Sequence, residues 1–255
     1  WILGSDSLVP RFAHGVLAAM LVLATAGSAW AGVEIGLNFT GRIAASPTAP
    51  TFWPDRPDSM GAVGPDHIVE LVNDGYAAYR KSDGTLLEST STLREFWEAA
   101  GVTPIGTSVA VDPRILYDAA SQRWFAVSID GFTPRDPISL FAPNNYLVAV
   151  SKSADPTVGW TGFQIDSDVT DTRWADFPQL GMDAEGLFVA TVRCGFGPSG
   201  TPVTCSGGNN LLVLPKADLL AATPSVANAM NWSNLKVGQV GRAPQPVVNL
   251  DGTGL

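Results

Sequence analysis

The sequence predicts an all-β, β-propeller-like protein of about three to four blades, each a four-stranded antiparallel sheet. Short runs of β-branched and aromatic residues recur along the chain, and turn-forming residues separate them. One sequence plan repeats three times, and only two segments have helical character. The expected strands are residues 67–73, 76–80, 85–89, 114–118, 123–130, 145–151, 162–166, 186–192, 210–215 and 246–250.

Both helical segments are short. Residues 92–101 begin with Thr92 as a helix N-cap and end at Gly101, and residues 216–222 are long enough for about two turns. So little helix excludes a helical bundle, and the 26 glycines and 19 prolines are typical of a fold rich in turns.

The repeated plan is visible in "PDSMGAVGPDHIVELV", "VDPRILYDAASQRWFAV" and "ADFPQLGMDAEGLFVAT". Each copy opens with an aspartate, runs through small and apolar residues to a second aspartate, and continues into a turn and an apolar strand. The leading aspartates are Asp58, Asp112 and Asp176, and the second ones are Asp66, Asp118 and Asp183. Copies roughly 60 residues apart fit one blade each. Because the first strand of a blade lines the propeller channel, we expect the polar starts to face water or ligand.

The two ends of the chain differ from the repeats. Arg11 and His14 precede the apolar run "GVLAAMLVLATA", and the small residues Ala29 and Ala31 follow it. This layout predicts a signal peptide with an upstream extension over residues 1–31, and the run is too short to span a membrane. Residues 32–255 are expected to form the propeller-like domain. Since "PVVNLDGTGL" looks like the start of another blade, we expect the propeller to be truncated at its C-terminus.

Charge and motifs exclude several function classes. The net charge is −9 and the chain has no cluster of lysine and arginine, so no nucleic-acid partner is expected. Neither a dinucleotide fingerprint nor a phosphate-binding loop occurs, so no nucleotide cofactor is expected. A serine hydrolase would need His67 as its base, and the Gly-x-Ser-x-Gly motif is absent.

Cys194 and Cys205 are the two cysteines of the chain. In an exported protein they have an oxidising compartment, and a Gly/Pro/Ser-rich segment between two expected strands should let them meet. We therefore predict a disulfide. A zinc site is not expected, because the mature chain offers only His67 as a further soft ligand.

Residues 151–160, "SKSADPTVGW", lie between two expected strands. Ser153, Asp155 and Trp160 resemble the Asp box of sialidase-like propellers, whereas Thr157 and Gly159 exchange the residue types of that motif. Such boxes lie between the third and fourth strands of a blade. The resemblance implies a structural role, in which the aspartate accepts hydrogen bonds from turn amides and the tryptophan packs between sheets.

A broader resemblance covers nearly the whole chain after residue 31. The three repeat copies, together with "VAVSKSADPTVGW", resemble a family of secreted bacterial propeller-type proteins whose function is largely unassigned. Members of that family often carry C-terminal signals for surface sorting or matrix attachment. The resemblance implies a secreted, extracellular propeller.

Arginines recur near the starts of the repeats. The set comprises Arg56, Arg114 and Arg173. If all three point toward one face, they could clamp a carboxylate in the way that acidic sugars are held. The alternative is that each arginine pairs with a neighbouring aspartate and braces a loop.

The leading aspartates are the second candidate set. Converging carboxylates could bind a cation or serve as acid and base in glycoside hydrolysis. Their alternative role is to accept amide hydrogen bonds and stabilise turns. The predicted ligand-binding residues are Asp58, Asp112, Arg114, Arg173 and Asp176.

Two further groups are weaker candidates. The segment "IDSDVTDT" has the partial spacing of a calcium loop at Asp166, Asp168 and Asp171, but a surface turn is the preferred interpretation. Three tryptophans are expected to be exposed, where they could stack on sugar rings or seal contacts between blades. They are Trp53, Trp97 and Trp174.

These features predict a secreted, non-catalytic propeller module that binds a polysaccharide or a cell-surface partner. The alternative is an extracellular glycoside hydrolase or lyase of sialidase-like architecture. Such an enzyme should bring an arginine cluster, a pair of carboxylates and Tyr117 into one pocket, so geometry separates the two hypotheses.

Overall fold

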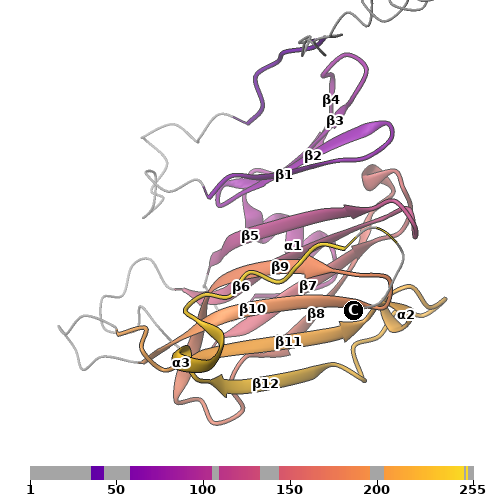
Figure 1. The fold of residues 1–255 in the computed structure, drawn as a ribbon. Helices are drawn as coiled ribbons and strands as arrows, with labels where there is room; N and C mark the ends of the chain where they lie inside the picture. The colour runs from indigo at the N-terminus through magenta and orange to yellow at the C-terminus, as the bar shows by residue number, and fades with distance from the viewer. Residues whose placement is uncertain are drawn as a thin grey trace, which may run out of the picture. The chain divides into compact units, whose positions relative to one another are not determined.

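The computed structural model in Figure 1 describes residues 36–42, 58–104, 109–132, 144–195, 204–249 and 251. The expected signal peptide over residues 1–31, together with Trp53 and Arg56, lies outside the described residues. Within the ranges that are described, no helix is both long and apolar enough to cross a membrane.

The described strands form three four-stranded sheets, and each sheet follows chain order with antiparallel neighbours. The first sheet contains β1 (Met60–Val63), β2 (His67–Val72), β3 (Gly75–Arg80) and β4 (Leu86–Ser89). The second contains β5 (Val109–Asp118), β6 (Arg123–Phe132), β7 (Asn145–Ser151) and β8 (Trp160–Asp166). The third contains β9 (Arg173–Met182), β10 (Gly186–Gly195), β11 (Asn209–Pro215) and β12 (Met230–Leu235). These sheets are propeller-like blades, so the predicted fold class is confirmed.

The middle sheet is apolar on both faces, because alternation along its strands divides its side chains between two cores. On β6, Trp124 and Ala126 enter the core shared with the first sheet, whereas Phe125 and Val127 enter the core shared with the third. The first core also holds Val69, Leu71, Tyr76, Phe96 and Trp97, and the second also holds Leu180, Leu187, Val189, Leu212 and Leu214. The middle sheet therefore packs against both of the others.

Helix α1 (Leu93–Ala99) connects the first sheet to the second. The Thr92 side chain accepts a hydrogen bond from the Glu95 amide at 3.1 Å, which caps the helix as the sequence predicts. Gly101 has φ 92°, a left-handed conformation that glycine adopts readily after a helix. The expected helix over residues 216–222 is shorter in the structure, where α2 spans Lys216–Leu219.

Several elements differ from the sequence prediction, and the expected strands include neither β1 nor β9. β12 and α3 (Val237–Val240) were not expected, since their largely exposed residues carry no clear apolar period. The strand expected over residues 246–250 is reduced, among the described residues 246–249, to one parallel bridge between Val248 and Met182. Gln245 and Val247 hold this segment against β9 through hydrogen bonds with the backbone of Leu180 and Met182.

The segment 151–160 lies between β7 and β8, the third and fourth strands of the middle sheet. Asp155 accepts hydrogen bonds from the amide and hydroxyl of Thr157 at 2.9 and 2.7 Å, ahead of a 3₁₀ turn over Pro156–Val158. Trp160 is buried, and its ring lies 5.3 Å from Phe96. These contacts are structural in kind.

The expectation that Trp97 and Trp174 are exposed is wrong. Both side chains are buried, Trp97 against Phe96 in the first core and Trp174 in the second core. Large aromatic side chains between sheets bury a large apolar area when the blades pack. Their burial therefore stabilises the packing of one sheet on the next.

A buried ion pair joins the second and third sheets. Lys216 Nζ, at the start of α2, lies 2.6 Å from Asp118 Oδ2 at the end of β5, and both side chains are 5% exposed. Lys216 also donates to the Asp183 carbonyl at 2.9 Å. Burial alone would raise the pKa of Asp118, but hydrogen bonds from Lys216 and Ser121 together with the lysine charge lower it.

The Asp118→Asn substitution should lower the free energy of unfolding by about 3 kcal/mol, because Lys216 would remain charged and buried without its counter-charge. Urea unfolding at pH 7 measures the change. Asp83→Asn is the matched control, since Asp83 pairs with Arg80 at an exposed site and its loss should change stability far less. A loss at Asp118 no larger than the loss at Asp83 would contradict the prediction.

Candidate functional site

The first strands of the three sheets lie next to one another, since β1 contacts β5 and β5 contacts β9. One residue adopts left-handed backbone geometry at an equivalent point of each blade: Asp58, two residues before β1, with φ 42°, Asp112 in β5 with φ 53° and Phe177 in β9 with φ 55°. None of the three is glycine, so each conformation costs free energy, and such strain often marks a functional site.

β-Bulges accompany two of the left-handed residues. From Val111 to Arg114, β5 has one residue more than the facing stretch of β6, and from Asp176 to Gln179 β9 has one more than β10. Each bulge contains a proline, Pro113 or Pro178, whose lack of an amide proton is tolerated where regular pairing is interrupted. Bulges of this kind redirect side chains, here the carboxylates at the edge of the site.

The register shows which residues of the repeats are equivalent. Tyr117 faces Trp124 near the start of β6, and Met182 faces Leu187 near the start of β10, so Tyr117 corresponds to Met182. Counting back along the strands, Asp112 corresponds to Phe177 and Arg114 to Gln179. Asp176 therefore lies one residue before the position in β9 that is equivalent to Asp112.

The carboxylates of Asp58, Asp112 and Asp176 nevertheless come together. The negative charges of Asp176 and Asp58 both act on Asp112, and Asp58 also shares a hydrogen bond with it. Asn73 links two of the strands: its Nδ2 donates to Asp58 Oδ2 at 2.7 Å, and its Oδ1 accepts from the Asp112 amide at 2.8 Å. Three sheets thus contribute one acidic group each to a single cluster.

The electrostatics of the cluster favour a bound proton. Burial raises the pKa of Asp112 to about 7, and the charges of Asp176 and Asp58 add to the shift while Arg114 opposes it. Burial is also the main reason that the pKa of Asp176 is raised, although a hydrogen bond from the Phe177 amide opposes that shift. Near neutral pH the cluster therefore contains a carboxyl group that can donate a proton.

A cleft of about 420 Å³ adjoins the cluster along the first strands. Its walls are formed by residues 58–60, 114–116, 179–180, 245 and 248. The Arg114 guanidinium lies 5.5 Å from the centre of the Phe177 ring, and Phe177 is 47% exposed. An exposed aromatic ring beside half-buried carboxylates is suited to contact with the apolar face of a sugar.

The predicted arginine cluster does not form among the described residues. Arg114 lies at the carboxylates, but Arg173 begins β9 and approaches Gly195 and Gly207 instead. The register explains the difference, because Gln179 is the residue equivalent to Arg114. Tyr117 also lies elsewhere, since its ring packs against Trp124 at 4.7 Å near the other end of β5. The arginine and tyrosine set of a sialidase is thus not assembled in this part of the chain.

The calcium hypothesis for Asp168 is not supported by the geometry around it. Its carboxylate accepts hydrogen bonds from the amides of residues 170 and 173, from the hydroxyls of residues 170 and 172, and from Arg193 Nη2 at 2.9 Å. Because these donors occupy its lone pairs, a cation would have to displace them. These contacts, and the guanidinium charge, lower the pKa of Asp168 against the effect of burial.

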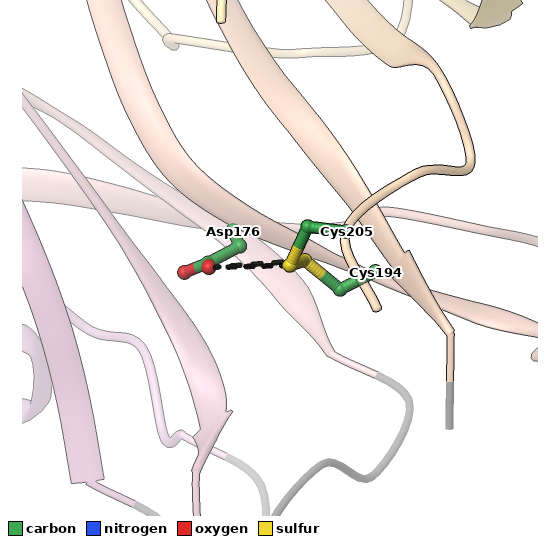
Figure 2. A group of neighbouring side chains, drawn as sticks. All are labelled: Asp176, Cys194 and Cys205. Carbon is green, nitrogen blue, oxygen red and sulfur yellow. Dashed lines mark hydrogen bonds between the residues drawn. A yellow bond between two sulfur atoms is a disulfide. The ribbon is translucent and has the colours of Figure 1, made fainter. Parts of the chain in front are cut away.

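The predicted disulfide is confirmed. Cys194 and Cys205 are joined by an S–S bond with their Cα atoms 3.9 Å apart, and Asp176 lies beside them (Figure 2). The ligand atoms of these three residues lie within 4.8 Å of one another. Since both sulfurs are used in the disulfide, neither is a thiolate that could bind a metal ion.

Sequence reasoning missed Asn73, Phe177 and Gln179. Asn73 ends the second strand of its blade and looks like an ordinary turn residue. The Pro178 that follows Phe177 was the one available signal, because the residue before a proline is driven away from helical geometry.

Comparison with protein-family models finds no match, and comparison with curated protein sequences finds none either. Solved structures do show similarity. The catalytic domain of a GH62 alpha-L-arabinofuranosidase from Coprinopsis cinerea matches with a TM-score of 0.38 and 11% identity over 69% of this chain and 50% of that one. A xylan beta-1,4-xylosidase from Bacillus halodurans matches with a TM-score of 0.41 and 10% identity, over 70% of this chain and 32% of that one.

The arabinanase of Bacillus subtilis matches with a TM-score of 0.32 and 13% identity over 62% of this chain and 65% of that one. The present chain thus spans half of the length of the first of these structures and about a third of the second.

Asp112→Asn should raise the free energy of unfolding at pH 8 by about 1–2 kcal/mol. Because the pKa of Asp112 is raised from 3.8 to about 7, its stability contribution is complete below 3.8 and falls as the pH rises through that window. Urea unfolding at pH 4 and pH 8 should show a gain only at the higher pH.

Asp171→Asn provides the control, because Asp171 also has left-handed geometry, φ 52°, but is exposed and outside the cluster. Equal effects at the two positions, or a loss of stability in the Asp112 variant, would indicate that the carboxylate is a structural acceptor.

Proposed function

We propose that this chain is an extracellular carbohydrate-active propeller protein that hydrolyses glycosidic bonds at the cluster of Asp58, Asp112 and Asp176. The observation that supports the proposal is the meeting of carboxylates from three sheets beside a cleft, with the pKa of Asp112 raised to about 7. Hydrolysis was the alternative in the sequence analysis. Holding like charges together destabilises the folded chain, and such arrangements with a raised carboxyl pKa are typical of catalytic acids.

In this proposal Asp112 is the general acid. Protonated below pH 7, it would deliver its proton to the glycosidic oxygen as the bond to the sugar breaks. Asp58 or Asp176 would be the second carboxylate, which either activates water or stabilises the positive charge that develops on the sugar ring. Asn73 would orient the acid, because it holds Asp58 and the Asp112 backbone together.

The extracellular location is supported by the disulfide between Cys194 and Cys205. Disulfides persist in oxidising compartments and are rare in the cytosol. The signal peptide expected over residues 1–31 agrees with export.

Release of reducing sugar from a panel of glycans, including arabinan, xylan and galactan, tests the function. Activity should fall as the pH rises through about 7, because Asp112 then loses its proton. Asp112→Asn should lower kcat by about 100- to 10,000-fold, the usual range for loss of a general acid. Asp171→Asn should leave kcat unchanged.

Two results would contradict hydrolysis. The first is glycan binding, measured by calorimetry, with no release of sugar by the wild-type chain between pH 4 and pH 8; this would establish the non-catalytic binding module. The second is equal activity in the wild type and in Asp112→Asn.

The charge of the cluster also indicates the class of sugar. Among the described residues, Arg114 is the one cation whose charge acts on Asp112, and the charges of Asp112 and Asp58 act on Arg114. A site with this balance repels acidic sugars, so we propose neutral glycans as substrates. The proposal of neutral glycans replaces the acidic-sugar ligand that the spacing of the arginines indicates.

We expect KM for a uronic-acid polymer to exceed KM for a neutral polymer of similar length by at least about tenfold, equivalent to ~1.4 kcal/mol. Raising the salt concentration should narrow the difference, because added ions screen the repulsion. A preference for the uronic-acid polymer at low salt would contradict the assignment.

A further inference from the structure

The disulfide lies directly against one of the three clustered carboxylates. Cys194 Sγ lies 3.8 Å from Asp176 Oδ2, and Cys205 Sγ lies 4.0 Å from the same oxygen. Figure 2 shows the carboxylate beside the sulfur pair. Cys194 lies in β10, Cys205 lies in the segment that precedes β11, and Asp176 comes from the neighbouring strand β9.

Backbone hydrogen bonds pair the two segments on both sides of the disulfide. Arg193 and Gly208 are joined by an amide-to-carbonyl hydrogen bond of 2.9 Å, and the Gly195 amide donates to the Thr204 carbonyl at 3.0 Å. The Gly207 amide donates to the Arg193 carbonyl at 3.1 Å. Residues on both sides of the sulfurs are therefore already paired, and the distinctive contribution of the disulfide is the surface that it presents.

That surface is uncharged and has no proton to donate, because each sulfur is bonded to the other. Its contact with Asp176 Oδ2 is accordingly a packing contact. A hydrogen bond from water to a carboxylate oxygen spans about 2.8 Å, so a separation of 3.8 Å leaves no room for a water molecule between oxygen and sulfur. The disulfide therefore removes water from one side of Oδ2.

The other oxygen of the same carboxylate has a backbone partner. Asp176 Oδ1 accepts a hydrogen bond of 2.9 Å from the Phe177 amide, within the β-bulge of β9. One oxygen of the carboxylate is thus held by a backbone donor, and the other lies against the two sulfurs. In this position its charge acts on Asp112, and the charge of Asp58 acts on it.

We propose that the Cys194–Cys205 disulfide is a positioning element that holds the Asp176 carboxylate, partly dehydrated, in the acidic cluster. Any effect of the disulfide on catalysis rests on the proposed function, whereas its effect on the pKa of Asp176 can be measured without activity. The disulfide touches no substrate in this scheme and acts only through Asp176. Without the disulfide, water would reach Oδ2 and favour the ionised carboxylate.

The first test compares the wild type with the double variant Cys194→Ala and Cys205→Ala. Carboxyl resonances of ¹³C-labelled aspartate, followed by NMR from pH 3 to pH 9, report the pKa of each residue. We expect the pKa of Asp176 to fall by about one unit in the double variant, because hydration stabilises the charged form. Asp155, in the middle sheet, is the internal reference and should titrate as before.

A second measurement removes the disulfide without mutation. Tris(2-carboxyethyl)phosphine reduces the folded wild type to two thiols, and the phosphine takes oxygen from water to become the phosphine oxide. The same fall in the pKa of Asp176 is expected. Because the charge of Asp176 acts on Asp112, removing the disulfide from the wild type should also shift the titration of Asp112. Asp176→Asn is the matched control, because removing the disulfide from this variant should leave the titration of Asp112 unchanged.

An unchanged pKa of Asp176 in both disulfide-free forms would overturn the proposal and leave the disulfide as a brace of the hairpin. Loss of the fold in both forms would overturn it as well, because the disulfide would then be required by the sheet. If no glycan is hydrolysed, the proposed function fails, yet the NMR titration still decides whether the disulfide positions Asp176.

Discussion

Packing of the middle sheet against both of its neighbours is the interaction on which the rest of this structure depends. Its strands alternate side chains between two apolar cores, and each core is completed by another sheet. Burying both faces aligns the first strands side by side, since β1 contacts β5 and β5 contacts β9. The carboxylates of Asp58, Asp112 and Asp176 can meet only because this stacking brings three distant parts of the chain together.

The acidic cluster opposes the stability that the cores supply. Left-handed geometry at Asp58 and Asp112 costs free energy, and so does the burial of neighbouring carboxylates. Arg114 offsets part of the repulsion, and the Lys216–Asp118 pair joins the second and third sheets away from the cluster. Local destabilisation held in place by a packed scaffold is typical of sites that perform chemistry.

Much of the fold could be predicted from local patterns. Strand runs with alternating or continuous apolar residues, the Thr92 cap and the Gly101 stop all act over a few residues, so they appear in the structure as expected. β12 could not be predicted, because its residues are mostly exposed and its conformation depends on pairing with β11, which is distant in sequence. The burial of Trp97 and Trp174 likewise depends on sheets that are distant in sequence.

For the site, the sequence by itself determined the chemical inventory: aspartates and arginines at the starts of three repeats, and one pair of cysteines. Only the tertiary structure decided which of these groups act together. Counting residues placed Arg173 in phase with Arg114, whereas strand pairing makes Gln179 the equivalent residue. The physical reason is that a period in sequence counts residues, while position in a sheet depends on hydrogen-bond register, which bulges and loop lengths change.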